Sequence, residues 1–120
     1  MIEETTRGAP SFAIEVDRHE DAQSLVLRGD FVDGSADLFR DQLKKAQSRQ
    51  GGSLIIDLRG LDSIDADGFG ALLGAWNLTR QDGVEIILVR VSKQMRPLIE
   101  QSGIDRVLPV AYDGGRFDRP

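Results

Sequence analysis

The sequence predicts a small α/β domain built on a mixed sheet, and two observations carry that prediction. Short apolar runs at residues 54–56 and 86–89 have the length and β-branched composition of buried strands. Segments with apolar residues three and four positions apart alternate with them, as is typical of amphipathic helices. Strand–helix–strand units with short loops imply right-handed crossovers. The 120 residues suit one domain, long enough to fold without a disulfide or metal.

The N-terminal part of the chain predicts a β-hairpin. Residues 1–10 are mostly polar, and we expect them to form a flexible N-terminus. Residues 12–16 place apolar side chains at every second position, which is the period of a half-buried strand. Residues 25–27 supply a second strand after a charged turn.

A first helix is predicted to follow this hairpin. It begins near Asp33, with Asp33 or Ser35 as the N-cap, because short polar side chains satisfy the free N–H groups of a first turn. It ends at residues 50–52, where two glycines favour a helix stop. Its apolar stripe consists of Ala36, Phe39, Leu43 and Ala46.

The central unit is a buried strand beginning near residue 53 that leads into a second helix over about residues 67–81. Gly70 and Gly74 lie four residues apart beside the helix's apolar stripe, and small residues at that spacing let another backbone approach closely. The stripe consists of Phe69, Leu72, Leu73 and Trp76, and it predicts that Trp76 packs in the core.

The C-terminal part predicts one strong strand, a short helix and one weak strand. Residues 84–91 are apolar almost without alternation, which indicates burial on both faces of the sheet. Pro97 predicts either a turn followed by a helix that starts at the proline, or a distorted first turn. We expect a last strand within residues 104–110 and a flexible tail over residues 111–120. The domain itself is therefore predicted over residues 11–110.

Composition narrows the classes of function. The net charge of −5 opposes binding to phosphate backbones, so nucleic acid is a disfavoured partner. The absence of cysteine excludes a disulfide framework and a thiolate metal site. The N-terminus lacks the features of a signal peptide, and no apolar run approaches a membrane span, so we expect a cytoplasmic protein without membrane insertion. Nothing in the sequence suggests a cofactor.

The polar stretch between the central strand and the second helix has three interpretations, and the first is a metal site. Ser63, Asp65, Asp67 and Gly68 occupy places one, three, five and six of a calcium-binding loop. Place twelve, however, is Gly74 where such a loop needs a bidentate glutamate, and no helix precedes the stretch. A metal site is therefore disfavoured.

The second interpretation is catalysis. The single histidine, His19, lies in a charged turn and is best explained as a solvated loop residue. No nucleophile–base pair and no phosphate-binding glycine loop is apparent. A phosphohydrolase built on Asp57, Asp65 and Asp67 is disfavoured because Arg59 stands where a second aspartate is needed. We therefore do not expect an enzyme.

The third interpretation is a recognition loop at the start of the second helix. The simplest role for Asp67 is that of N-cap, accepting from the free N–H groups near Phe69 and Gly70. The same position favours negative charge because of the helix dipole. It is therefore also where an added phosphate acts most strongly.

The order of these motifs resembles the STAS domain, and most closely the bacterial anti-sigma factor antagonists. The resemblance covers residues 12–110 and rests on the strand LIIDL, the loop with aspartate and glycine three apart, the helix start GALLGAW, the strand IILVRV and the segment from Ser92 to Ile104. It implies a mixed sheet of four or five strands with helices packed mainly on one face.

The resemblance also implies a function. Such antagonists bind an anti-sigma factor that is a serine kinase, and phosphorylation of a Ser or Thr at the start of the second helix breaks the complex. Asp65 and Gly68 match the family pattern, whereas Asp67 occupies the phosphoacceptor position. The phospho-switch is therefore expected to be absent or mimicked at Asp67. Ser63 and Thr79 are better explained as a loop hydroxyl and a helix-surface residue than as substitute acceptors. The expected partner-binding residues are Ile64, Asp65, Ala66, Asp67, Gly68, Phe69 and Gly70.

One alternative from another class stays open. A STAS domain can also serve as a scaffolding or small-ligand-binding subunit of a transporter or a stress-signalling complex. In either case we expect a protein partner, and a chain that is a monomer or a weak homodimer.

Overall fold

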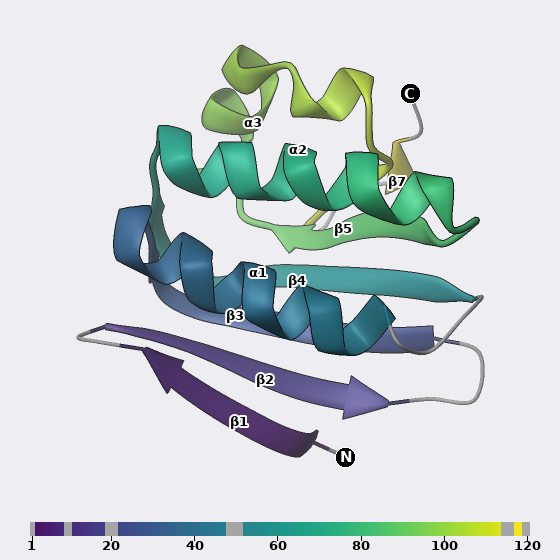
Figure 1. Cartoon of the computed structure of the whole chain (residues 1–120). Helices are drawn as coiled ribbons and strands as arrows, with labels where there is room; N and C mark the ends of the chain where they lie inside the picture. The colour runs from purple at the N-terminus through teal and green to yellow at the C-terminus, as the bar shows by residue number, and fades with distance from the viewer. Residues whose placement is uncertain (1, 9–10, 19–21, 48–51, 114–116, 119–120) are drawn as a thin grey trace.

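The computed structural model describes residues 2–8, 11–18, 22–47, 52–113 and 117–118, and it forms one sheet with helices on one face (Figure 1). The strands are β1 (Ile2–Gly8), β2 (Phe12–Arg18), β3 (Ala22–Phe31), β4 (Ser53–Ile64), β5 (Glu85–Val91), β6 (Val110–Tyr112) and β7 (Phe117–Asp118). The helices are α1 (Asp33–Gln47), α2 (Ala66–Gln81), α3 (Arg96–Ser102) and the 3-10 turn η1 (Ile104–Arg106).

The seven strands lie in the sheet in the same order as in the sequence. The pairs β1–β2, β2–β3 and β6–β7 are antiparallel, whereas β3 to β6 are mutually parallel. Each parallel pair needs a crossover, and α1, α2 and α3 with η1 supply the three crossovers. The prediction of a mixed α/β sheet with helices mainly on one face is confirmed, with β2 to β6 as its five central strands.

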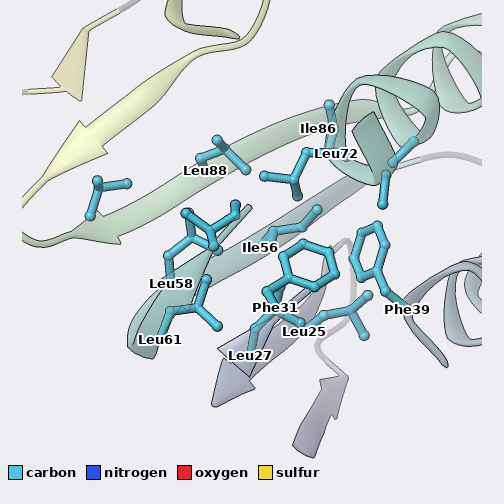
Figure 2. Close-up of a cluster of buried hydrophobic side chains, with 14 of the residues drawn as sticks. Leu25, Leu27, Phe31, Phe39, Ile56, Leu58, Leu61, Leu72, Ile86 and Leu88 are labelled. Carbon is cyan, nitrogen blue, oxygen red and sulfur yellow. The ribbon is translucent and has the colours of Figure 1, made fainter. Parts of the chain in front are cut away.

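The core lies between the sheet and the helices (Figure 2). Leu25, Ile56 and Leu88 are neighbours across β3, β4 and β5, and each is 0% exposed. Phe31 stacks on Phe12 with ring centroids 5.4 Å apart and meets the edge of Phe39 at 5.2 Å. Each such side chain contributes about 1.5–3 kcal/mol by leaving water. These contacts attach the helices to the sheet.

Several predicted elements are confirmed. The hairpin is β2–β3, and Ala36, Phe39 and Leu43 form the buried stripe of α1, while the side chain of Ala46 lies outside the described residues. Pro97 occupies the first turn of α3 after a turn at residues 93–95, which is the first of the two arrangements predicted. His19 and residues 48–51 also lie outside the described residues.

The ends of the chain differ from the prediction. Residues 2–8, expected to be flexible, form β1 along β2, and residues 117–118 of the expected tail form β7 along β6. Strand addition at a sheet edge uses backbone N–H and C=O groups and needs no apolar pattern, so the side chains give little sign of it. The predicted last strand over residues 104–110 is instead η1 followed by β6 at Val110–Tyr112.

The prediction that residues 84–91 are buried on both faces of the sheet is wrong. Ile86, Leu88 and Val91 are buried toward the helices, whereas Ile87 and Val89 point to the opposite face and are half-buried. The run of apolar residues therefore reflects one covered face and one apolar face without a helix. The prediction of Ser35 as a possible N-cap of the first helix is also wrong, because Ser35 lies inside α1 and its hydroxyl donates to the Asp30 carbonyl at 2.6 Å.

Candidate functional site

The candidate site is the junction between β4 and α2. Because parallel β3 and β4 end at the same edge of the sheet, the last residues of β3 lie beside this junction: Asp30 pairs with Ser63 and Phe31 with Ile64. The Ser63 hydroxyl donates to Asp30 Oδ1 at 2.8 Å, and the Asp65 N–H donates to the Phe31 carbonyl at 3.3 Å. Two elements far apart in the sequence thus hold the junction in place.

Asp65, not Asp67, caps α2. Asp65 has an extended backbone, and its Oδ1 accepts from the Gly68 N–H at 3.0 Å while its carbonyl accepts from the Phe69 N–H at 3.0 Å. This is the geometry by which an N-cap satisfies the free donors of the first turn. The prediction of a helix over about residues 67–81 is confirmed, but the prediction of Asp67 as its N-cap is wrong by two positions, because Asp67 already lies within the first turn of a helix that begins at Ala66.

Asp67 lies in the first turn of α2 and its side chain is exposed. A carboxylate there stabilises the helix through the dipole by about 0.3–1 kcal/mol. Because Asp65 already caps the helix, Asp67 is free of that role and presents its charge to solvent. This is the arrangement that a recognition role at Asp67 requires.

Gly68 packs α2 directly onto the end of β3. A Cβ added at Gly68 would stand 2.3 Å from the Phe31 carbonyl oxygen and 2.8 Å from Ile64 Cγ1. No side chain fits there without moving the helix, so the fold itself demands glycine. Gly70 and Gly74 differ, because an added Cβ at either one meets no atom of the described residues within 4 Å.

The predicted site residues fall into two groups. Ala66, Asp67 and Gly70 are exposed, and Asp65 and Phe69 are half-buried, with Phe69 packed against the core. Ile64 and Gly68 are buried and support the others from beneath. One continuous exposed surface therefore runs from the β4–α2 junction along the outer side of α2. Gly74 is also exposed on this side of α2, and Leu78, one turn further along, is 40% exposed. Neither was among the predicted site residues, although the spacing of four that relates Gly70, Gly74 and Leu78 places them on one side of a helix.

The two residues considered as alternative phosphoacceptors, Ser63 and Thr79, differ in solvent exposure. Thr79, expected on the helix surface, is only 1% exposed, and its hydroxyl donates to the Ala75 and Trp76 carbonyls. That prediction is wrong because Thr79 faces the sheet. Ser63 is exposed at the end of β4, where its hydroxyl is bonded to Asp30. Trp76 is partly buried against the core, with the Arg80 guanidinium 4.5 Å from its ring centroid.

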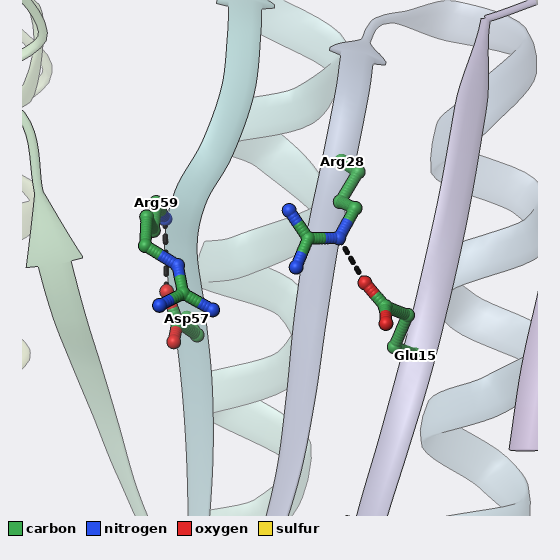
Figure 3. Close-up of polar contacts among 4 residues, drawn as sticks. All are labelled: Glu15, Arg28, Asp57 and Arg59. Atoms are coloured by element: carbon green, nitrogen blue, oxygen red, sulfur yellow. Dashed lines mark hydrogen bonds and ion pairs between the residues drawn. The ribbon is translucent and has the colours of Figure 1, made fainter. Parts of the chain in front are cut away.

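The carboxylates considered for catalysis do not converge. Asp57 lies on the face of the sheet opposite the helices, where Arg59 lies beside it (Figure 3) and Arg90 Nε is 3.5 Å from its Oδ2. Asp65 instead points into the first turn of α2. Among the described residues, no group of three or more His, Cys, Asp or Glu side chains lies close enough together to hold a metal ion.

This arrangement, a sheet with helices on one face and a capped helix start at the edge, defines an α/β domain with an exposed strand–loop–helix surface. Residues 13–113 match the STAS domain, and the chain belongs to that family. It is 30% identical over 101 residues to the anti-sigma F factor antagonist of Paenibacillus polymyxa, covering 83% of this chain and 86% of that protein.

Two solved structures share the fold. An anti-sigma factor antagonist from Mycobacterium paratuberculosis superposes with a TM-score of 0.76 at 16% identity, over 88% of this chain and 90% of that one. The anti-sigma factor antagonist SpoIIAA in its unphosphorylated form superposes with a TM-score of 0.60 at 20% identity, over 78% and 96% of the two chains. In the part of the chain that the structure describes, no helix has the length and apolar character needed to cross a membrane.

Proposed function

We propose that this chain is a non-enzymatic interaction module that binds an anti-sigma factor with serine kinase activity, through residues 64–70 and the outer side of α2. The observation that carries the proposal is Asp67, an exposed carboxylate in the first turn of α2 at the position where antagonists of this family carry the phosphoacceptor. The relative from Paenibacillus polymyxa, which is named as an antagonist of an anti-sigma F factor, supports an anti-sigma factor as the partner.

The outer side of α2 supports a protein partner. A glycine inside a helix costs about 0.5–1 kcal/mol relative to alanine, and Gly70 and Gly74 have no contact within the described residues that demands glycine. Their cost is explained if a partner's backbone approaches the helix closely there. The exposed side chain of Leu78 continues this surface and would add apolar contact area.

The charge at Asp67 determines how such a complex would be regulated. Aspartate has no hydroxyl for a serine kinase to esterify, so the usual switch cannot operate at this residue. A carboxylate carries about one negative charge, against about 1.5–2 for a phosphate. Asp67 therefore either imitates the modified form in part, which makes the interaction weak, or meets a partner adapted to the carboxylate, which makes it constitutive. In both cases the interaction is not controlled by phosphorylation at this residue.

The experiment that tests this proposal restores a phosphoacceptor hydroxyl at residue 67. Affinity capture from the native cell should recover a small kinase, which is then purified and incubated with ATP and the Asp67→Ser variant. We expect phosphate on residue 67 of that variant and none on the wild type. The matched control is Asp62→Ser, which creates an exposed serine just outside the helix and should remain unmodified. Phosphorylation of the wild-type chain, for example at Ser63, would overturn the proposed loss of the switch.

Binding affinities then separate the two roles open to Asp67. If its charge imitates a phosphate, Asp67→Ser binds the kinase more tightly than the wild type does. If the partner has adapted to the carboxylate, the same variant binds more weakly. Recovery of transporter subunits without any kinase would instead favour the scaffolding alternative.

A further inference from the structure

The end of β4 that leads into α2 is not a regular strand, because its pairing with β3 shifts register twice. The flanking pairs are Val26–Asp57 and Arg28–Gly60 at the first shift, and Gly29–Leu61 and Asp30–Ser63 at the second. At each shift β4 contains one residue more than β3 does, which is a β-bulge. Bulges are rare between parallel strands and are over-represented beside functional sites. Both of these bulges lie directly before residues 64–70.

The two bulges determine which side chains of β4 face the helices. In a regular strand every second side chain points to the same face, and a shift of one residue moves the side chains that follow to the other face. The buried apolar residues of β4 are two apart before the first bulge and three apart across each bulge. They are Leu54, Ile56, Leu58, Leu61 and Ile64. Loss of either bulge alone would turn Ile64 away from the helices.

The first bulge is held by a buried carboxylate. Asp57 is 6% exposed, and its Oδ1 accepts from the Arg59 N–H at 2.9 Å (Figure 3). Its Oδ2 lies 3.5 Å from Arg90 Nε. A bulge leaves backbone groups without a partner on the next strand, and the Asp57 carboxylate satisfies one of them. Burial of a carboxylate is unfavourable unless it is bonded and paired, and Asp57 is both.

The partner of Asp57 on β5 has a strained backbone. Arg90 has φ 54°, the only positive φ among the described residues that are not glycine, and such a conformation is uncommon for an arginine. It lies where the register between β5 and β6 shifts. Strained conformations persist only where the surrounding structure fixes them, and they gather at functional sites. Asp57 and Arg90 lie outside both the apolar core and residues 64–70, so neither accounts for the strain.

The second bulge is held by a pair of polar side chains at the surface. The Ser63 hydroxyl donates to Asp30 Oδ1 at 2.8 Å. Asp30 is fixed in turn, because its N–H donates to the Ser11 carbonyl at 2.8 Å and its carbonyl accepts from the Ser35 hydroxyl at 2.6 Å. Gly29 makes the first of these contacts possible, since it has φ 93° and an added Cβ would stand 1.8 Å from the Ser11 carbonyl oxygen. Ser63 thus attaches the end of β4 to a fixed point on β3.

We propose that Asp57 and the Asp30–Ser63 pair are positioning residues for the interaction surface of residues 64–70. Each holds one bulge of β4, and the two bulges together set the direction in which Asp67 is presented to a partner. The identity of the partner rests on the proposed function, whereas the position of residues 64–70 in the free chain does not.

The position of the junction depends on the Asp30–Ser63 pair more than the stability of the fold does. The bond lies at the surface, where water replaces a lost hydrogen bond at little net cost. Beyond Ser63, the next bond from the junction to β3 is that of the Asp65 N–H to the Phe31 carbonyl, which is long at 3.3 Å. Loss of the pair should therefore loosen the junction without unfolding the domain.

The first test needs no partner and measures hydrogen exchange of the backbone amides in the full chain. Ser63→Ala and Asp30→Ala remove the same bond. In both we expect the Asp65 N–H to exchange at least tenfold faster at an unchanged thermal midpoint, with no further increase in the double variant. Asp30→Asn keeps an acceptor oxygen and should restore the wild-type rate. The matched control is Glu100→Ala, which breaks an exposed ion pair on α3.

The second test uses the kinase and the Asp67→Ser variant as background. The rate at which residue 67 is phosphorylated then reports how that residue is presented. We expect Ser63→Ala and Asp57→Ala each to slow phosphorylation at least tenfold. Asp57→Asn can still accept from the Arg59 N–H and should retain most of the rate. Because Ser63 is exposed, Ser63→Ala guards against a failure of Asp57→Ala to fold.

Two results would overturn the positioning role. One is an Asp65 amide that exchanges at the wild-type rate after the Asp30–Ser63 bond is broken. The other is a phosphorylation rate that falls only in variants whose thermal midpoint falls with it, which would make the bulges part of the fold alone. If no kinase phosphorylates the Asp67→Ser variant, the proposed function fails, and the exchange rates still decide whether these residues hold the junction.

Discussion

The two sides of α2 use the same small residue for different reasons. On the inner side, Gly68 lies against the Phe31 carbonyl and leaves no room for a Cβ. On the outer side, Gly70 and Gly74 are exposed and touch nothing that a Cβ would disturb. The inner glycine is a condition of folding, because it sets how closely the helix start approaches β3. No contact within the described residues requires the outer glycines, which is why the proposed interface includes them.

The largest expected difference in stability between the inner and outer sides of α2 comes from two of its leucines. Leu72 is 0% exposed and Leu78 is 40% exposed, on opposite sides of the helix. We expect Leu72→Ala to lower the free energy of unfolding by about 2–5 kcal/mol, because it leaves a cavity in the core. Leu78→Ala should cost less than about 0.5 kcal/mol. Urea unfolding of both variants measures the difference, and equal losses would contradict the assignment of the two sides.

The next effect concerns Gly68. An alanine there forces its Cβ against the backbone of β3, which cannot move as cheaply as a side chain can. We expect Gly68→Ala to lower the free energy of unfolding by about 1–3 kcal/mol. The same denaturant titration measures it. A variant as stable as the wild type would mean that the α2 start is not held against Phe31.

A smaller effect separates the two aspartates at the helix start. Asp65→Ala removes the bond to the Gly68 N–H and should cost about 1 kcal/mol. Asp67→Ala loses only the interaction with the helix dipole and should cost about 0.5 kcal/mol, less at high salt. Thermal unfolding at low and high salt distinguishes them. A larger loss of stability for Asp67→Ala than for Asp65→Ala would indicate that Asp67 caps the helix.

The smallest effect has the opposite sign. Gly70→Ala and Gly74→Ala should each raise the free energy of unfolding by about 0.5–1 kcal/mol, since alanine is the better helix former and its Cβ meets open space. If a partner's backbone approaches α2 there, the same variants bind it more weakly although they fold better. Unfolding curves and affinity measurements on the same preparations test both halves. Unchanged affinity would remove the outer side of α2 from the proposed interface.

The sequence was sufficient for the elements whose patterns are local. Three local patterns each predicted an element that the structure contains: the alternation of residues 12–16, the stripe of Ala36, Phe39 and Leu43, and the helix start expected at Pro97. The β4–α2 junction was also predictable, because a short apolar run followed by Asp65 and Gly68 has few other structures open to it. The predicted position of the N-cap within that junction was wrong, because a sequence pattern cannot distinguish between two aspartates that lie two residues apart.

The rest was decided by packing between distant segments. β1 and β7 were missed because they are held by backbone pairing with the sheet edges, which leaves no side-chain pattern. Thr79 was placed on the surface because a threonine in a helix gives no sign of whether the sheet lies beside it. The difference between Gly68 and Gly70 was equally invisible, since it depends on where the Phe31 carbonyl lies.

By itself, the sequence determined that the chain is an α/β domain of the STAS pattern with an acidic residue at the start of its second helix. Hydrophobic periodicity and motif order are properties of neighbouring residues and survive without coordinates. Only the tertiary structure decided that Asp65 caps the helix, which leaves Asp67 exposed, and that the apolar strand β5 has one side without a helix. The capping bond itself is local, but the position of Asp65 is fixed by its N–H bond to the distant Phe31 carbonyl, and the two faces of β5 are defined only when the helices pack on the sheet.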